Sequence, residues 1–366
     1  MVVRCSAVSE TVTTAPPPAL PPRERGLTRR TWTLIVSFLV VAALGLLGGF
    51  ARVPYVALGP GPTYDVLGKV KDTDVVSVDG QDTFPTKGTL RMTTVSLTDD
   101  VSLFGALGLW LSGRYALAPR EEFFKPGESE EEVQKNNELA FSESQTSAEV
   151  AALHYLKYPG MVIANQVTKG SPADNVIPLG ARIISVNGKQ VQSAADVSSA
   201  LENTKPGDRI EVAFEKDGTS QSTQLTLGTR DDGRAAGFIG ISPVDRADVP
   251  FKIKISLSDV GGPSAGLIFA LAIVDKLTPG ELNGGKAIAG TGEIAGDGTV
   301  KPIGGIAFKM VAAKEAGATA FLVPAANCTD AKQQAPSDLK LIKVENLSDA
   351  VSSLEALNSG KDTPSC

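Results

Sequence analysis

The chain is poor in the residues that build the commonest metal and hydrolase sites, with one histidine and three cysteines among 366 residues. Cys5, Cys328 and Cys366 lie far apart, and with one histidine they do not supply the ligands of an ordinary zinc site. We therefore expect no metal. A Ser-His-Asp triad would have to use His154, which lies on the apolar face of a helix predicted over 147–157. We interpret His154 as a half-buried structural side chain.

An excess of positive charge is also lacking. The formal net charge is -6 and no dense face of Lys and Arg is apparent, so we expect no nucleic-acid partner. Hydrophobic residues make up 42% and charged residues 21%, which is typical of a globular protein, and the length allows two domains.

One long hydrophobic run is present near the N-terminus. Thr31–Ala51 contains no charged residue and matches the roughly 20 residues that span a bilayer. Several arginines precede this run and only Arg52 follows it closely, so the positive-inside rule places 1–30 in the cytoplasm and the chain from about Val53 outside. The proline-rich stretch in 1–30 predicts a disordered tail. A cleaved signal peptide is the alternative, but the length of the run and of the segment before it favours a retained anchor.

Three further features follow from composition. Cys328 and Cys366 both fall outside the cytoplasm and would be able to pair there, although the sequence does not fix the distance between them. The apolar segment Phe104–Ala118 is too short to span a membrane. We expect it in the core or in an oligomer contact, with the membrane surface as the alternative. The acidic segment 119–138 predicts a solvated loop.

Residues 160–227 alternate short β runs with turns such as Asn187-Gly188 and contain one predicted helix over 193–205. The region resembles a PDZ domain in three motifs: Gly170-Ser171-Pro172-Ala173, Leu179–Gly188 and Pro206-Gly207-Asp208. The resemblance implies binding of extended C-terminal or internal peptides along a sheet edge. Ala181 stands where an Asp is common in the family, and Tyr158–Met161 is a candidate carboxylate-binding loop.

The segment Gly261–Gly266 (GGPSAG) lies between a predicted strand, Lys252–Leu257, and a predicted helix reaching about Lys276. Pro263 suits the first helical position, so Ser264 would lie in the first turn beside free backbone N–H groups. Such donors suit the oxyanion that develops during acyl transfer. The turn and oxyanion site would comprise three residues: Gly262, Pro263 and Ala265. A serine that only caps the helix and an anion site at a Gly-rich helix start are the alternatives.

Lys309 lies in the apolar stripe of a helix predicted from Ile306 to Ala316. A lysine that faces a core is costly unless it is neutral or partnered, and desolvation lowers its pKa. A neutral amine would be able to accept the Ser264 proton and return it to the leaving amine. The alternative is a snorkelling or ion-paired lysine.

A nucleotide site is disfavoured. Gly280–Lys286 fits the pattern G-x-x-x-x-G-K, but Ala287 occupies the Ser/Thr position that holds Mg²⁺ in a P-loop. We expect neither ATP nor any other cofactor.

Taken together, these motifs resemble the proteolytic domain of Lon-type Ser-Lys peptidases. Ser264 in GPSAG matches the nucleophile motif and Lys309 in PIGGIAFK the general-base motif. Thr291 in TGEI matches the segment between them, whose threonine supports the lysine in the family. Lys87–Leu90 and Ser147–Glu149 look like an earlier strand and helix of the same domain. The resemblance therefore implies a catalytic Ser264, Lys309 and Thr291.

The chain departs from the family in two respects. Gly261 stands three residues before the serine, where many members have an acid, and Asp259 lies two places earlier. The ATPase of typical Lon enzymes is missing, so we expect ATP-independent proteolysis of unstructured or exposed segments.

These observations predict an α+β protein in which a Lon-type proteolytic domain carries an inserted PDZ-like β module and one N-terminal transmembrane helix. The arrangement is similar to the PDZ-containing, membrane-anchored Lon-like serine proteases of bacteria. The expected parts are a tail (1–30), a transmembrane helix (31–51), the first part of the Lon-like domain (53–158), a PDZ domain (159–229), the catalytic part (237–356) and a flexible tail (357–366).

The predicted function is ATP-independent serine endopeptidase activity at the cell membrane, with the N-terminus cytoplasmic and the catalytic domain extracytoplasmic. Expected partners are unfolded or exposed peptide segments, protein C-termini and the membrane. The resemblance also implies homo-oligomers, often hexamers. The alternative is a catalytically silent, membrane-anchored platform that binds peptides through its PDZ domain, but such a protein would be expected to lose Ser264 or Lys309, and both are present.

Overall fold

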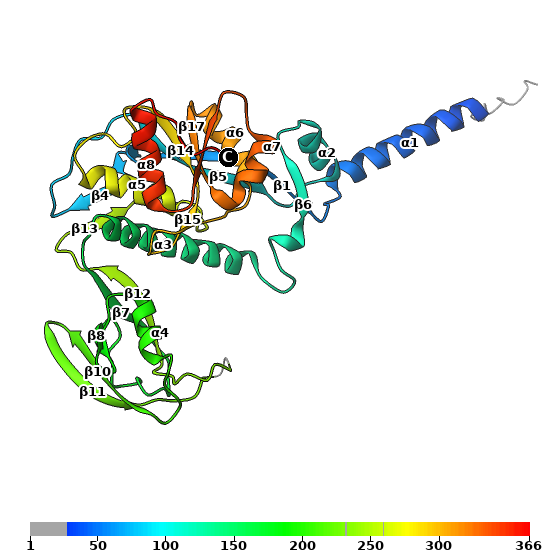
Figure 1. Cartoon of the computed structure of the whole chain (residues 1–366). Helices are drawn as coiled ribbons and strands as arrows, with labels where there is room; N and C mark the ends of the chain where they lie inside the picture. The colour runs from blue at the N-terminus through cyan, green and yellow to red at the C-terminus, as the bar shows by residue number, and fades with distance from the viewer. Residues whose placement is uncertain (1–27, 231–232, 259) are drawn as a thin grey trace, which may run out of the picture.

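The computed structural model describes residues 28–230, 233–258 and 260–366. Most of the predicted tail, with Cys5, and Asp259 lie outside the described residues. Figure 1 shows two β units, one above the other, and a helix that projects from the side of the upper unit.

The projecting helix is α1 (Arg29–Phe50), which coincides with the predicted membrane span. The hydroxyl of Thr28 caps its first turn by accepting a bond from the N–H of Thr31. Only Gly48 is buried, and every other residue keeps part of its surface exposed. By length and composition α1 is able to cross a membrane.

The larger unit is built on a six-stranded sheet in the order β18-β17-β14-β5-β1-β6. Its strands are β1 (Tyr55–Asp65), β5 (Thr89–Thr98), β6 (Ala116–Pro119), β14 (Ala287–Gly290), β17 (Ala320–Pro324) and β18 (Lys340–Val344). Neighbours from β5 to β18 pair in parallel, whereas β1 is antiparallel to β5 and β6. The parallel pair β5–β14 joins two segments of chain that lie on opposite sides of the smaller unit in the sequence.

Three small ladders complete the larger unit. They are β2 (Lys69–Val70) with β3 (Thr73–Asp74), β4 (Val76–Asp79) with β13 (Lys252–Ile255), and β15 (Glu293–Ile294) with β16 (Val300–Lys301).

Helices cover both faces of the large sheet. One layer comprises α3 (Glu130–Tyr155), α5 (Gly266–Leu277) and α8 (Leu347–Asn358). The other comprises α6 (Ile306–Glu315) and α7 (Cys328–Gln334). Two short 3-10 turns, η1 (Arg120–Glu122) and η2 (Ala325–Asn327), lie in the connecting segments. Successive strand residues point to opposite faces, so Ile288 joins the core around α5 while Ala289 joins the core around α6. A Cys328–Cys366 disulfide ties the C-terminus to α7, as the predicted pairing allowed.

The smaller unit is a second sheet with its own core. Its strands are β7 (Gly160–Val167), β8 (Arg182–Val186), β9 (Lys189–Gln190), β10 (Arg209–Lys216), β11 (Thr219–Thr226) and β12 (Ile241–Ala247), and α4 (Ala194–Leu201) packs against it. The order is β11-β10-β8-β7-β12, with β9 paired to β8. Because α3 runs into β7 and β12 leads to β13, this unit is an insertion in the larger one (Figure 1).

Two segments differ from the sequence-based expectations. The predicted loop 119–138 is helical from Glu130, where a capping box between Ser129 and Glu132 starts α3. The first turns of α3 are polar and exposed, so they show no apolar periodicity. The segment Phe104–Ala118, expected in the core or in an oligomer contact, supplies most of α2 (Leu103–Leu111), on which only Ala106 is fully buried, so most of this helix lies outside the core.

Candidate active site

The predicted nucleophile lies in a turn between β13 and α5. Helix α5 begins at Gly266, so Ser264 precedes it by two residues and Pro263 is not at the first helical position, as we had expected. The Ser264 carbonyl accepts the N–H of Gly292, which anchors the turn to the segment after β14. The Ser264 side chain remains partly accessible to solvent.

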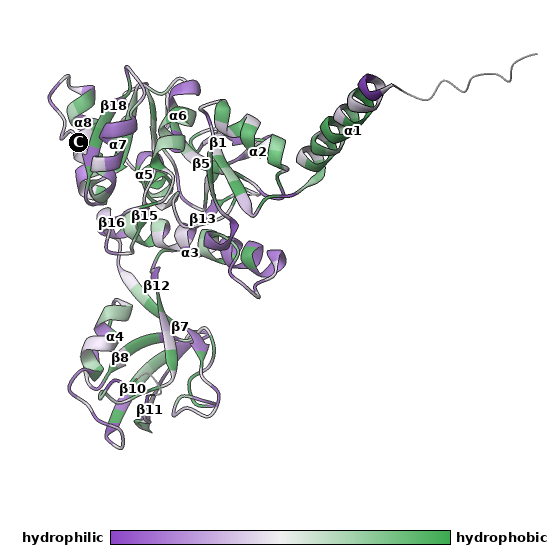
Figure 2. Ribbon diagram, turned by 90° about the vertical axis from the view of Figure 1, so that its right-hand side faces the viewer, coloured by the Kyte–Doolittle hydropathy of each residue, from purple (hydrophilic) through white to green (hydrophobic). Residues whose placement is uncertain are grey.

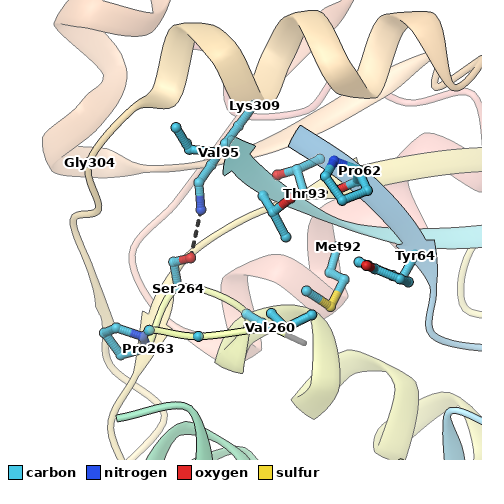
Figure 3. Close-up of a pocket in the computed structure, with 14 residues that line it drawn as sticks. Pro62, Tyr64, Met92, Thr93, Val95, Val260, Pro263, Ser264, Gly304 and Lys309 are labelled. Atoms are coloured by element: carbon cyan, nitrogen blue, oxygen red, sulfur yellow. Dashed lines mark hydrogen bonds between the residues drawn. The ribbon is translucent and has the colours of Figure 1, made fainter. Parts of the chain in front are cut away.

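Lys309 reaches this turn from the other side. It lies on α6, is 3% exposed, and its Nζ lies 2.6 Å from the Oγ of Ser264 (Figure 3). Gly305 precedes helix α6 as its N-cap, and its left-handed backbone (φ 69°) suits glycine. A Cβ at Gly305 would also lie 2.6 Å from the side chain of Val95 on β5, so glycine allows the helix to approach the sheet.

Thr291 connects the two groups. It follows β14 directly, is fully buried, and its hydroxyl donates to the Ser264 carbonyl at 2.9 Å. The same oxygen lies 3.0 Å from the Nζ of Lys309 and accepts its N–H. Since each atom of the cluster has a defined partner, the amine is held in one position beside the serine hydroxyl.

Burial perturbs the lysine. Desolvation lowers the pKa of Lys309 from 10.5 to about 8. No carboxylate lies within ion-pair distance of its amine among the described residues, so nothing there restores the charged form. Such an amine is neutral in a useful fraction near neutral pH, which is what a general base requires.

Some backbone N–H groups around Ser264 already donate hydrogen bonds within the protein, and others have no acceptor. The N–H of Gly262 donates to the carbonyl of Asn137 on α3, and Pro263 has no N–H. Within the described part of the chain, the N–H groups of Ser264 and Ala265 have no acceptor. Of the three predicted turn residues, Ala265 therefore offers a donor to a substrate oxyanion, and Gly262 and Pro263 shape the turn.

Helix α3 supports this turn through two contacts that the sequence did not reveal. The hydroxyl of Ser144, which is 4% exposed, donates to the carbonyl of Pro263 at 2.9 Å. The second contact is the bond from Gly262 to Asn137. A buried serine on a helix with an otherwise apolar inner face was the available signal, but its partner lies 119 residues away in the sequence.

A cavity of about 380 Å³ opens onto the dyad (Figure 3). Side chains of β1 and β5, including Tyr64 and Met92, form one wall, and the turn residues form the other. A second cavity of about 690 Å³ shares Val260 and Gly261 with the first and extends between η1 and the start of α3. The two cavities give an extended chain room on one side of Ser264.

The remaining sequence candidates lie elsewhere. His154 is exposed, not half-buried as expected, and lines a cavity between α3 and the smaller unit. In the described ranges no three His, Cys, Asp or Glu residues gather as metal ligands do. Lys286, the lysine of the G-x-x-x-x-G-K pattern, donates to Asn358 at the entrance to β14.

Two family models match the chain. Residues 253–356 match the C-terminal proteolytic domain of Lon protease (S16), and residues 133–227 match the PDZ domain. The chain thus combines a Lon-type proteolytic domain with an inserted PDZ module and an N-terminal apolar helix, which confirms the predicted fold class. The PDZ match ends before β12, although β12 pairs with β7 along its whole length.

The curated relatives match about a third of this chain or less. The chain is similar to the Lon proteases of Phenylobacterium zucineum (33% identity over 32% of this chain), Methylocella silvestris (35% over 32%) and Campylobacter concisus (38% over 25%). It spans 15%, 15% and 11% of the length of these relatives. Among solved structures, the PDZ domain of an SdrC-like protein from Listeria monocytogenes matches at 22% identity with a TM-score of 0.21, covering 24% of this chain and 90% of that one.

Proposed function

We propose that the protein is an ATP-independent serine endopeptidase that cleaves peptide bonds with a Ser264–Lys309 dyad and is anchored in a membrane by α1. The observation that carries the proposal is the 2.6 Å contact between the Ser264 hydroxyl and a lysine amine that is 3% exposed. Burying an amine has a free-energy cost that packing does not require. A catalytic role accounts for it.

The proposed reaction uses the neutral amine first as a base and then as an acid. Lys309 accepts the Ser264 proton while Oγ attacks the carbonyl carbon of the substrate, and the N–H groups of Ser264 and Ala265 bind the oxyanion. The ammonium then donates its proton to the leaving amine, which departs and leaves an acyl-enzyme. Water, deprotonated by Lys309, attacks this ester, and the serine regains its proton as the second product leaves. Thr291 orients the amine throughout.

The proposed role of the PDZ module is to capture substrate segments or protein C-termini along the edge strand β12. One side of β12 pairs with β7, and α4 lies near β12. A peptide would therefore add to the sheet along the free side of β12, between β12 and α4. The candidate loop Tyr158–Met161 is less suitable, because Gly160 and Met161 already pair with β12.

The proposed topology places the N-terminus in the cytoplasm and both β units outside it, as the arginines before the hydrophobic run Thr31–Ala51 indicate. We also propose a homo-oligomer, which mass photometry of the protein in nanodiscs would measure. A hexamer would give six times the protomer mass after subtraction of the nanodisc.

The dyad is tested with the full-length protein in nanodiscs and an unfolded protein such as casein as substrate. We expect cleavage by the wild type that is unchanged by added ATP, and loss of at least about 10³-fold in kcat for Ser264→Ala and Lys309→Ala. Lys309→Arg should be equally inactive, because guanidinium is not a base at neutral pH.

Lys314→Ala is the matched control, because Lys314 lies on the same helix with its amine bonded to a backbone carbonyl away from the site. Cleavage that survives in purified Ser264→Ala would overturn the dyad. The outcome that favours the silent peptide-binding platform has two parts. No form of the protein cleaves casein, whether or not C-terminal peptides are added to the assay, and those peptides still bind.

A further inference from the structure

The face of α2 that points away from the protein is apolar and uncovered. Helix α2 (Leu103–Leu111) exposes five large apolar side chains by 47% to 68%: Leu103, Phe104, Leu107, Trp110 and Leu111. Its opposite face is anchored in a small core with β1 and β6, through Ala106 and Leu109. A helix that is fixed on one side and apolar on the other requires a partner on the exposed side.

The position of α2 identifies that partner. Helix α2 packs against the last turns of α1, with Phe104 so close to Gly48 that a Cβ there would lie 2.4 Å from the ring. Figure 2 shows apolar residues dominating both helices, with α2 on the side of the larger unit from which α1 departs. Any bilayer that contains α1 therefore has its surface at the level of α2.

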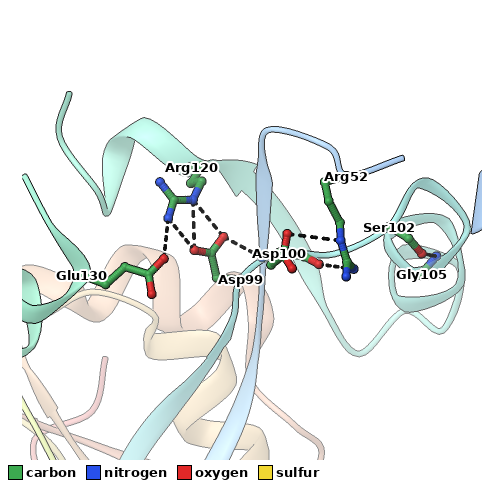
Figure 4. A network of polar contacts seen from close by, with 7 residues as sticks. All are labelled: Arg52, Asp99, Asp100, Ser102, Gly105, Arg120 and Glu130. Atoms are coloured by element: carbon green, nitrogen blue, oxygen red, sulfur yellow. Dashed lines mark hydrogen bonds and ion pairs between the residues drawn. The ribbon is translucent and has the colours of Figure 1, made fainter. Parts of the chain in front are cut away.

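Polar contacts fix the angle between the two helices. The Ala51 carbonyl accepts the N–H of Leu103, and the N–H of Val53 donates to the carbonyl of Val101. Arg52 pairs with Asp100, its Nε 3.2 Å from the carboxylate (Figure 4). The chain that leaves α1 and the chain that enters α2 are thus held side by side.

Around these contacts the composition changes from apolar to charged. Ser102 caps α2 through the N–H of Gly105, and beyond it Arg120 binds Asp99 and Glu130 (Figure 4). Apolar side chains on one side and ion pairs on the other reproduce the polarity profile of a membrane interface, where tryptophan is also enriched.

We propose that α2 is an interfacial membrane helix that inserts its apolar face into the outer leaflet beside α1 and seats the larger unit on the lipid surface. The inference rests on the proposed anchoring by α1. With two attachments, a spanning helix and an interfacial one, the body cannot swing freely about residues 51–53. The active-site cavity is then held at a fixed height above the bilayer.

The two tryptophans of the chain, Trp32 and Trp110, allow a direct test. The full-length Trp32→Phe variant leaves Trp110 as the sole indole and Trp110→Phe leaves Trp32 near the start of α1, 56% exposed. Both variants are reconstituted into phosphatidylcholine vesicles that carry bromine at a shallow or a deep position of the acyl chain. We expect shallow bromine to quench Trp110 fluorescence by about half, and more than deep bromine does.

Leu107→Gln with Leu111→Gln, in the Trp32→Phe background, should at least halve the quenching of Trp110, because two inserted side chains become polar. Leu179→Gln, on an exposed leucine of the smaller unit, is the matched control and should leave the quenching unchanged.

The Trp32 reporter separates the two proposals. Quenching of Trp32 without quenching of Trp110 would overturn the interfacial role of α2 while α1 remains anchored, and would indicate that another protein surface, such as a second copy of this chain, covers α2. If neither tryptophan is quenched, the anchoring by α1 fails and the role of α2 fails with it.

Discussion

At the scale of single residues, the proposed chemistry depends on one lysine whose charged form is disfavoured by burial. Because desolvation lowers the pKa of Lys309 to about 8, about a tenth of the molecules carry a neutral amine at pH 7. In the proposed mechanism the deprotonated form is the base. We therefore expect kcat/KM to rise about tenfold per pH unit below pH 8 and to level off above it.

The measurement is casein or peptide cleavage between pH 6 and 9.5 at constant ionic strength. His154→Ala should give the same profile, because the only histidine is exposed and lies away from the dyad. A limb of the profile that disappears in this variant would assign the base to histidine and contradict the dyad.

The same burial affects stability. The lowering of the Lys309 pKa from 10.5 to about 8 corresponds to roughly 3 kcal/mol of destabilisation of the folded state at pH 7. The hydrogen bonds of the amine to Ser264 and Thr291 recover about 1 kcal/mol of this. We expect Lys309→Met to raise the free energy of unfolding by about 2 kcal/mol at pH 7. The folded-state pKa lies below the unfolded one, so the destabilisation is complete below pH 8 and disappears as the pH rises from 8 to 10.5.

Urea unfolding in detergent at pH 7 and pH 10 measures this change. The gain from Lys309→Met should be present at pH 7 and absent at pH 10, whereas Lys314→Met, at a partly exposed lysine, should show no gain at either pH. A Lys309→Met protein that is less stable than the wild type at pH 7 would mean that the lysine contributes to the fold.

At the scale of elements, α3 links the nucleophile turn to the PDZ module. Its middle holds the turn through Ser144 and Asn137, and its C-terminal end continues into β7. We expect Ser144→Ala to lower kcat about tenfold with little change in KM, because the bond to the Pro263 carbonyl positions Ser264 and does not contact substrate. The loss of this bond should also destabilise the protein by about 1 kcal/mol.

Steady-state kinetics and the rate of Ser264 labelling by a fluorophosphonate probe measure the effect, and both rates should fall together. Ser142→Ala, two residues earlier on the exposed side of α3, is the matched control. A Ser144→Ala protein that keeps its labelling rate would show that the contact is only structural.

The elements differ in how well the sequence predicted them. The helices α5 and α6 and the β7–β11 succession follow from periodicity and turn residues, and the structure has them within a few residues. The start of α3 was missed because its stabilising contacts are the capping box at Ser129 and charges in solvent. The role of Ser144 was missed because it depends on a partner that only tertiary folding brings near.

The site residues also differ in how well the sequence predicted them. Ser264 and Lys309 were predicted because each breaks a local expectation, a serine in a Gly-Pro turn and a lysine in an apolar stripe, whereas Thr291 was predicted from the resemblance to Lon-type peptidases. The sequence placed Ser264 inside α5, but the turn extends to Ala265 because its carbonyls and N–H groups bond to α3 and to Gly292 rather than along the helix. Such cross-strand and cross-helix bonds leave no periodic signal.

At the scale of the whole molecule, the three cysteines report on topology. Cys328 and Cys366 form a disulfide, which persists in an oxidising compartment, whereas Cys5 precedes α1 in the chain and belongs to the proposed cytoplasmic segment. We expect a membrane-impermeant maleimide to modify Cys328 and Cys366 in intact spheroplasts only after reduction. It should modify Cys5 only after the membrane is disrupted.

Variants Cys5→Ser and Cys328→Ser/Cys366→Ser identify which thiol is modified in each case. Modification of Cys5 in intact spheroplasts would place the N-terminus outside and reverse the topology, which would also bring both β units into a reducing compartment. If the measured mass shows that the mature protein begins after α1 and therefore lacks Cys5, α1 is a cleaved signal peptide. The catalytic body would then depend on α2 alone for contact with lipid, and because one short interfacial helix binds a bilayer reversibly, it would be recovered largely in the soluble fraction.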